Sequence, residues 1–463
     1  MTSTMLHDRV IRRGALLTVM CVGMFLVLLD VTVVNVALPR IGADLMTGLP
    51  GQQWVIDGYS VALASLLLAG GTLGDRFGHK RVVLAGLVLF GAASLVCGLA
   101  PGLAVLVAGR ALQGLGAALL LPGTLAVITR AFPDRAEQAR AVGVWAGVSA
   151  LALPAGPLIG GALVSGFGWR AVFLINLPIV AVAVPATVRL VTESADRDSR
   201  RLDPLGIVLA TLILAAAVYA VITAGRTGLA GEVWIAAAVT VLALVGFLVW
   251  ERNAPQPLLP LPLLRTRAFA GANIVAATMN LVGVGTVFVA SLYLQTVQHH
   301  AAFVAGVLLL PLFVPLAALA PVTGRLTGRF GPRAPITAGL ILGIAGSLWL
   351  LGIAPASGYA RLLPVLLGLG IGMGLLTAAV VAAAVRAVPA DRSGLASGVN
   401  NTARQAAGAL AVAIYGSIVG SPNDATRFTA GLHVIALLGA GAWLAALAVT
   451  WFAIPGRPDA GER

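Results

Sequence analysis

Residues 71–80 read GTLGDRFGHK, and residues 324–333 read GRLTGRFGPR. The two stretches align without a gap, and they correspond at Gly71/Gly324, Leu73/Leu326, Arg76/Arg329, Phe77/Phe330, Gly78/Gly331 and Lys80/Arg333. Each stretch follows the second long apolar segment of a series of six. A motif that recurs at equivalent places predicts two similar halves related by an internal repeat.

The composition indicates a membrane protein. Of the 463 residues, 59% are hydrophobic and 10% are charged, whereas soluble domains carry about 25% charged residues. A helix that crosses the hydrocarbon core needs about 20 apolar residues. Fourteen such spans are predicted, at 14–38, 53–73, 82–100, 103–129, 140–165, 170–190, 204–224, 232–251, 269–296, 302–326, 335–354, 358–385, 394–420 and 430–454.

The expected architecture is an all-α polytopic membrane protein with two pseudo-symmetric six-helix bundles. Residues 1–190 would form the first bundle, 191–268 two additional helices with their flanking loops, and 269–463 the second bundle. Most of the 30 lysines and arginines fall in loops on one side, and such loops are usually cytoplasmic. An even number of spans then places both termini in the cytoplasm.

An aspartate interrupts the apolar segment FLVLLDVTVVNVALP at residues 25–39. A carboxylate at this depth costs at least about 2.5 kcal/mol, so by default it indicates an ion or substrate path. Counting about 1.5 Å per residue places Asp30, Asp57 and Arg110 at similar depths in three predicted helices. A nearby arginine would keep an aspartate ionised, and an aspartate that moves away from the arginine would take up a proton. All three are therefore candidates for proton or cation coupling.

Two plainer interpretations of these charges remain open. Arg110 and one aspartate could form a permanent internal salt bridge. Asp57 could also lie close enough to the membrane surface to be merely hydrated.

Seven motifs in order carry a resemblance that covers nearly the whole chain. They are LDVTVVNVALP at 29–39, QWVIDGYSVALASLLLAGG at 53–71, GTLGDRFGHKR at 71–81, RALQGLGAALLLP at 110–122, GPLIGG at 156–161, WRAVFLINLP at 169–178 and SGLASGVNNTARQAAGAL at 393–410. The chain resembles the major facilitator superfamily, specifically its fourteen-span branch of drug:proton antiporters. The resemblance implies a major facilitator fold in the cytoplasmic (inner) membrane of a bacterium, and it implies transport roles for Asp30 and Arg110.

The resemblance also implies that the repeated loop is a conformational latch, whose charge network holds the outward-open state. The latch residues would be Gly71, Gly74, Asp75, Arg76, Gly78, Arg81 and Arg329. The second copy has Gly328 where Asp75 stands, which weakens a latch role there. The alternative is a tight turn that merely carries cytoplasmic positive charge.

The segment GPLIGG is the pattern that bears on transport direction. Pro157 removes a backbone donor and bends a helix, while Gly156, Gly160 and Gly161 allow close packing against another helix. In the resembled family this pattern accompanies exporters that exchange substrate for protons. Generic tight packing is the alternative interpretation.

Polar residues in otherwise apolar spans predict a substrate cavity between the halves, because such groups must be satisfied within protein or by trapped water. The candidate lining residues are Asn35, Gln113, Asn280, Phe288, Tyr293, Asn400, Asn401 and Arg404.

The sequence argues against an enzyme and against an ATP-driven pump. It contains no GxxxxGK[ST], HExxH or GxSxG motif. No metal site or cofactor is expected, because the proton gradient would supply the energy. The prediction is a proton-driven exporter of amphipathic, including cationic, small molecules such as antibiotics, working as a monomer in the bilayer without nucleic acid. The alternative is a proton-coupled importer of a nutrient or metabolite.

Overall fold

The computed structural model describes residues 2–456 except 194–201, 260, 390–391 and 422–423. This part of the chain is helical and contains no strand. The first part comprises α1 (Thr2–Asp44), α2 (Leu49–Phe77), α3 (His79–Gly98), α4 (Leu103–Ala131), α5 (Arg135–Phe167), α6 (Ala171–Leu174) and α7 (Asn176–Leu190). A hairpin of α8 (Pro204–Thr227) and α9 (Gly231–Asn253) follows.

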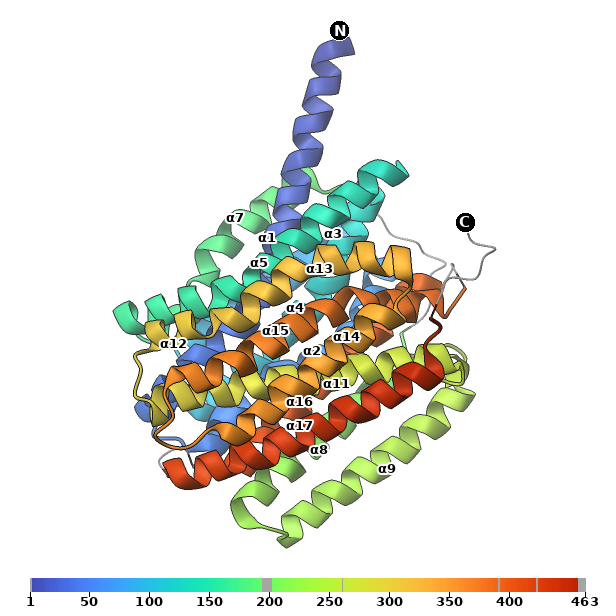
Figure 1. The fold of residues 1–463 in the computed structure, drawn as a ribbon. Coiled ribbons are helices and arrows are strands. Elements are labelled where there is room, and N and C mark those ends of the chain that lie inside the picture. The colour runs from blue at the N-terminus through green and yellow to red at the C-terminus, as the bar shows by residue number, and fades with distance from the viewer. Residues whose placement is uncertain (1, 194–201, 260, 390–391, 422–423, 457–463) are drawn as a thin grey trace.

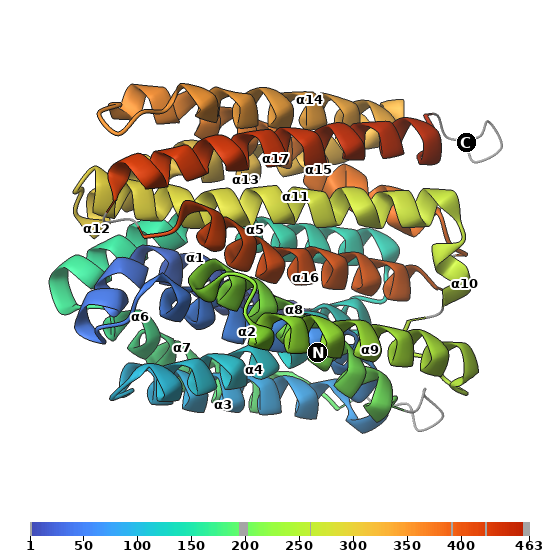
Figure 2. The same cartoon turned by 90° about the horizontal axis from the view of Figure 1, so that it is seen from below.

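The rest of the chain repeats the pattern of the first part. It comprises α10 (Leu261–Leu264), α11 (Arg267–Leu292), the π-helical turn η1 (Tyr293–Val297), α12 (Ala302–Leu308), α13 (Leu310–Phe330), α14 (Arg333–Trp349), the 3-10 turn η2 (Leu350–Gly352), α15 (Tyr359–Arg386), α16 (Ser393–Val419) and α17 (Ala425–Ala453). The long helices run roughly parallel or antiparallel in one bundle (Figure 2).

Within the described residues, thirteen helices are long and apolar enough to cross a membrane. The remaining long helix is α16, which corresponds to the span predicted at 394–420. Its polar residues Asn400, Asn401, Arg404 and Gln405 lower its apolar content. Because α16 packs against α2, α8 and α11, protein rather than lipid surrounds much of this polar stretch. The predicted fold is confirmed, and α16 is the one long helix among the described residues whose polar residues leave it short of the apolar content of the others' membrane-spanning stretches.

Two predicted spans are each broken into a short and a long helix. The span at 170–190 divides into α6 and α7, and the span at 302–326 divides into α12 and α13. Pro178 and Pro311 lie just after the two breaks. A proline has no N–H to donate to the carbonyl four residues earlier, and its ring clashes with that carbonyl. Each proline therefore favours a break in the preceding turn.

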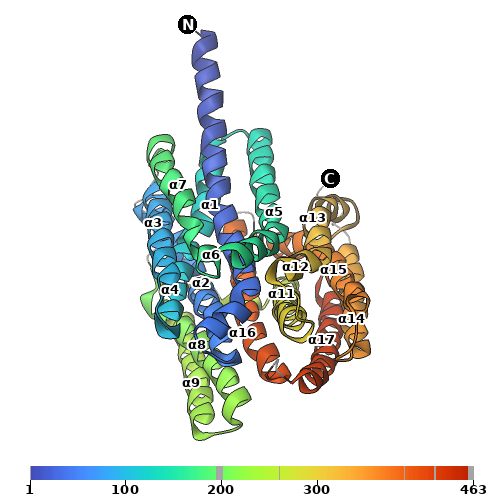
Figure 3. The same ribbon diagram turned by 90° about the vertical axis from the view of Figure 1, so that its left-hand side faces the viewer.

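The internal repeat is visible in the backbone. The α2–α3 turn passes through Gly78 at φ +99°, and the equivalent α13–α14 turn passes through Gly331 at φ +80°. Only glycine adopts such angles without strain. The packing of α4 on α2 and α3 is matched by that of α15 on α13 and α14. We call the face that carries these two turns the motif face. Figure 3 shows the two halves side by side, with the hairpin at the edge of the first half.

The inserted hairpin occupies a distinct place in the bundle. Helix α8 packs against α2 of the first half and α16 of the second, while α9 lies outside it (Figures 1 and 3). The outer surface of α9 exposes large apolar side chains, including Trp234, Ile235, Val241 and Leu242. Such a surface suits contact with lipid tails, which are as apolar as leucine.

Candidate functional site

An ion pair is buried inside the first half, between α1 and α4. The Arg110 Nη1 atom lies 2.5 Å from the Asp30 Oδ2 atom, and both side chains are at most 1% exposed. The Nε atom of Arg110 donates to the carbonyl oxygen of Val55 at 3.0 Å. The guanidinium carbon lies 4.4 Å from the ring centre of Tyr59 and 5.8 Å from that of Phe173. Arg110 is thus neutralised by a carboxylate and enclosed by two aromatic rings.

Gln113 extends this ion pair into a polar network. Its Oε1 atom accepts a hydrogen bond from Arg110 Nη1 at 2.9 Å, and its Nε2 atom donates to Ser94 Oγ at 2.8 Å and to Asp30 Oδ1 at 3.4 Å. Asn176 donates to the same Ser94 hydroxyl at 3.1 Å. Gln113 is fully buried in this network, so it supports the ion pair and does not line a cavity in this conformation.

Ser94 and Asn176 were missed in the sequence. The available signal was that each is a hydrogen-bonding residue within an apolar span, the criterion that had selected other candidates. Nothing in the sequence alone indicates that these two side chains meet.

Asp57 lies on α2 in a different environment from Asp30. It is fully buried, and neither carboxylate oxygen has a hydrogen-bond partner among the described residues. One turn earlier, Gln53 donates to the carbonyl oxygens of Val412 and Ala413 on α16 at 3.0 and 2.9 Å. One turn later, Val61 packs in an apolar cluster with residues of α8 and α16. Residues four apart share a helix face, so Asp57 faces the junction of the two halves and the inserted hairpin.

The two aspartates therefore differ in what stabilises a negative charge. Asp30 is paired with Arg110, whereas Asp57 has neither a cation nor a hydrogen-bond donor among the described residues. An ionised carboxylate buried without a partner is very costly, so such a group is normally neutral. The structure thus places Asp30 in the salt-bridge arrangement in this conformation. It also shows Asp57 buried rather than hydrated at a membrane surface.

A second polar group joins α11 and α16. Arg404 Nε donates to Asn280 Oδ1 at 3.4 Å, and Asn400 Nδ2 donates to Asn273 Oδ1 at 3.3 Å. Asn401 and Arg404 are partly buried, whereas Asn400 is 1% exposed. Three of the predicted cavity residues thus come together here. Asn273 was missed, although it precedes Asn280 by two helical turns on the same face.

Three other predicted cavity residues lie in packed positions. Phe288 is fully buried in an apolar core cluster that includes residues of both halves. Tyr293 is 1% exposed, and its single hydroxyl hydrogen is shared between two backbone carbonyl oxygens at 3.3 Å in the loop after η2. Asn35 donates to a carbonyl of its own helix, and its backbone oxygen accepts from Ser291 Oγ on α11 at 3.0 Å. In this conformation Phe288 and Tyr293 do not line a cavity, while Asn35 lies where the halves meet.

The glycines of the segment GPLIGG, which lies on α5, form close contacts with other helices. A Cβ on Gly156 would overlap α1, and one on Gly160 would lie 2.7 Å from the nearest side-chain atom of α1. Gly161 faces α12 of the second half, where a Cβ would come within 2.6 Å of the Phe303 Cα atom. The Pro157 carbonyl abuts a glycine of α12 in the same contact. The motif thus packs α5 against both halves, away from the motif face.

The sequence profile of the Major Facilitator Superfamily matches residues 20–412, which include most of both halves. The chain belongs to the major facilitator superfamily. Among curated proteins it is 36% identical over 420 residues to the multidrug resistance protein Stp of Mycobacterium tuberculosis, a match covering 89% of this chain and 78% of that protein. It is 36% identical to the methylenomycin A resistance protein of Streptomyces coelicolor, with 89% and 86% covered. It is 37% identical to the tetracenomycin C resistance and export protein of Streptomyces glaucescens, with 88% and 76% covered.

Solved structures support the same major facilitator fold. A mutant of the peptide transporter POT superposes with a TM-score of 0.70 at 16% identity, and the match covers 94% of both chains. A bacterial homologue of the human lysosomal transporter Spinster gives 0.65 at 16% identity and covers 96% of this chain and 97% of its own. At these identities the likeness concerns the fold alone.

The repeated loop of this major facilitator protein forms charge contacts within the first half. Asp75 Oδ1 lies 3.2 Å from His79 Nε2 and 3.8 Å from Arg130 Nη2 at the end of α4. Glu193, just after α7, lies 3.5 Å from Arg81 Nε. His79, Arg130 and Glu193 were not predicted from the sequence, where their only signal was a position beside the motif or at a helix end on the same face.

The remaining latch candidates have packing roles in this conformation. A Cβ on Gly74 would overlap the imidazole of His79, and one on Gly71 would touch Pro122 of α4 at 3.8 Å. Arg76 and Arg329 each lie over the ring of the phenylalanine that follows, at 5.4 and 5.2 Å. The two copies therefore share the aromatic contact as well as the turn.

Proposed function

We propose that this major facilitator exports amphipathic small molecules of the antibiotic class, including cations, in exchange for protons. The observation that carries the proposal is Asp57, a carboxyl group buried without a described partner where α2 meets α16 and α8. A neutral carboxyl at a moving interface is a proton carrier if the movement hydrates it. The names of the relatives, which refer to drug or antibiotic resistance and to export, support the direction of transport.

Conformational change would connect the proton to the substrate. Gln53 on α2 is tied to two carbonyls of α16 one turn from Asp57. This contact lies near the start of α2, opposite the motif face. If the halves rock apart here, water from that side reaches Asp57, and the carboxyl group can exchange protons with the side from which a proton-driven exporter takes them up. A cationic substrate that approaches Asp30, or a proton that binds to it, would weaken the pairing of Asp30 with Arg110.

We infer that the motif face is cytoplasmic, because most of the lysines and arginines lie on that side. Both termini would then be cytoplasmic in a bacterial inner membrane. The contacts of Gly161 with α12 and of Asn35 with α11 lie toward the other face. This conformation would thus be closed to the outside, and the substrate would enter from the cytoplasm or the inner leaflet. One chain contains both halves, so a monomer would suffice, and no cofactor is needed.

Reconstituted liposomes test the proposal. A pH gradient of either sign is imposed, and ethidium is followed together with a lumenal pH dye. An exchanger moves the cation against the proton flow. Cation and protons that move together would support the importer alternative. If ethidium does not move, proton flux on addition of tetracenomycin or methylenomycin provides the same test with other substrates.

Replacing Gly161 by leucine should reduce transport at least tenfold without unfolding the protein. The new side chain would meet the backbone of Phe303 at less than contact distance, and this overlap would keep the outer ends of α5 and α12 apart. Substrate efflux is measured beside the melting temperature. Gly166 on the same helix has no atom within 4 Å of its Cβ position, so Gly166→Leu is the matched control. Unchanged efflux by Gly161→Leu would contradict a functional closure at this contact.

A further inference from the structure

Two acidic residues lie buried at the base of the inserted hairpin, on the motif face. Asp203 precedes α8 and is 7% exposed, and Glu251 lies near the end of α9 and is 3% exposed. Asp203 Oδ1 accepts hydrogen bonds from the Gly206 backbone at 2.9 Å and from Trp250 Nε1 at 2.7 Å. Glu251 Oε2 accepts one from the Leu259 backbone at 3.0 Å. One oxygen of each acid is thus satisfied.

The other oxygen of each acid lacks a donor among the described residues. These atoms are Asp203 Oδ2 and Glu251 Oε1. They lie beside the same backbone position, because a Cβ on Gly206 would be 2.9 Å from Glu251 Oε1 and closer still to Asp203 Oδ2. The two carboxyl groups are within hydrogen-bonding reach of each other. Two carboxyls sharing a site do not both ionise readily, and one proton between them would satisfy both oxygens.

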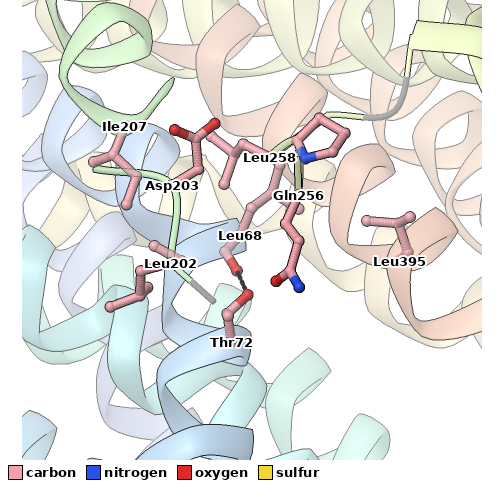
Figure 4. Close-up of a pocket in the computed structure, with 10 residues that line it drawn as sticks. Leu68, Thr72, Leu202, Asp203, Ile207, Gln256, Leu258 and Leu395 are labelled. Carbon is pink, nitrogen blue, oxygen red and sulfur yellow. Dashed lines mark hydrogen bonds between the residues drawn. The ribbon is translucent and has the colours of Figure 1, made fainter. Parts of the chain in front are cut away.

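Within the described part of the chain, no lysine or arginine forms a salt bridge with Asp203 or Glu251. Asp203 lines a small cavity of about 50 Å³ together with Leu68 and Thr72 of α2, Ile207 of α8 and Leu395 of α16 (Figure 4). Among the described residues of this lining, Asp203 is the one charged side chain. On the neighbouring elements, Arg252 of α9 and Arg392 before α16 are exposed, and both lie outside the lining. A space of this size admits water, which gives a proton a route to the pair.

We propose that Asp203 and Glu251 hold one proton between them and form a second proton-binding site, separate from Asp57. By bridging the two carboxyl groups, the proton would connect the start of α8 to the end of α9 and to the linker that follows α9. The linker residues Gln256, Pro257 and Leu258 line the same cavity between α2 and α16. As the pH on the motif face rises, the proton leaves to water, the two carboxylates repel each other, and the hairpin base loosens beside the junction of the two halves.

The sign of the pH dependence follows from linkage. Carboxyl groups of the unfolded chain release their protons above about pH 4, whereas the folded pair would retain one. The folded state therefore binds more protons than the unfolded state. The pair's contribution to the free energy of unfolding is thus present at low pH. It is lost as the pH rises through the value at which the folded pair releases its proton. In Glu251→Gln, the amide donates permanently to Asp203 and this dependence disappears.

Thermal melting of the full-length protein in detergent, from pH 5.5 to 9, tests the site without any substrate. The melting curves of wild type and Glu251→Gln should cross, with the variant more stable at high pH. Asp203→Asn should behave likewise. Glu232→Gln, at the other end of α9 and bonded to Tyr219, should follow wild type throughout. Variants that melt in parallel with wild type at every pH would overturn the proposal.

Two further measurements use the wild-type protein. Dicyclohexylcarbodiimide reacts with protonated carboxyls, so it should label the peptide of Asp203 or Glu251 at pH 6 and no longer at pH 9. Equal labelling, or none, at both values would contradict a titrating proton. Stabilisation by sodium, potassium or magnesium ions that Glu251→Gln abolishes would show that the pair holds a metal cation instead.

Discussion

Replacing Asp57 by asparagine should abolish proton exchange while leaving the folded protein at least as stable as wild type. The carboxyl group has no described partner and no exposed surface in this conformation, so a neutral side chain of the same shape removes no described hydrogen bond. It does remove the only atoms of this side chain that can bind and release a proton. Proton-driven substrate flux in liposomes should fall at least tenfold, with an unchanged or raised melting temperature.

The conservative variant Asp57→Glu is the control for this prediction. It retains a titratable carboxyl group on the same helix face, so part of the coupled flux should return. Unchanged proton flux in Asp57→Asn would remove Asp57 from the mechanism. A melting temperature several degrees below wild type would instead indicate a structural role for the carboxylate.

The sequence predicted the helices and the repeat because these depend on local composition. The sequence alone shows the apolar segments of membrane-spanning length. It also shows the glycines at the two equivalent turns. The same is true of depth, since Asp30, Asp57 and Arg110 can be counted from their helix ends. Depth does not give the direction in which a side chain points. For this reason the sequence could not decide which aspartate pairs with Arg110.

The cavity residues illustrate the same difficulty. Helix α11 is apolar on most of its surface and largely buried by protein, so periodicity does not reveal which face meets the other half. Phe288 and Asn280 lie eight residues apart on this helix, yet Phe288 is packed in the core and Asn280 meets Arg404. The asparagines gave a usable signal because a buried amide needs a partner. The aromatic residues gave none.

Replacing Arg110 by alanine should destabilise the protein by about 3–5 kcal/mol, the usual cost of removing one partner of a buried ion pair. Asp30 would remain as a buried charge in a site that also loses the guanidinium stacked on Tyr59. Neutralising both partners, in Asp30→Asn with Arg110→Gln, leaves no uncompensated charge. The double variant should therefore be more stable than Arg110→Ala, although it should not transport.

A double-mutant cycle separates the pairing energy from packing. Asp30→Asn, Arg110→Gln and their combination are compared by unfolding in detergent mixtures. Arg110→Gln should cost less in the Asp30→Asn background than in wild type, because no buried charge is then left uncompensated. Its cost should be the same in both backgrounds if Arg110 stabilises the protein through its aromatic contacts alone. Additive effects of the two substitutions would likewise show that the 2.5 Å contact contributes no coupling energy. Asp30 and Arg110 would then act on transport separately rather than as one unit.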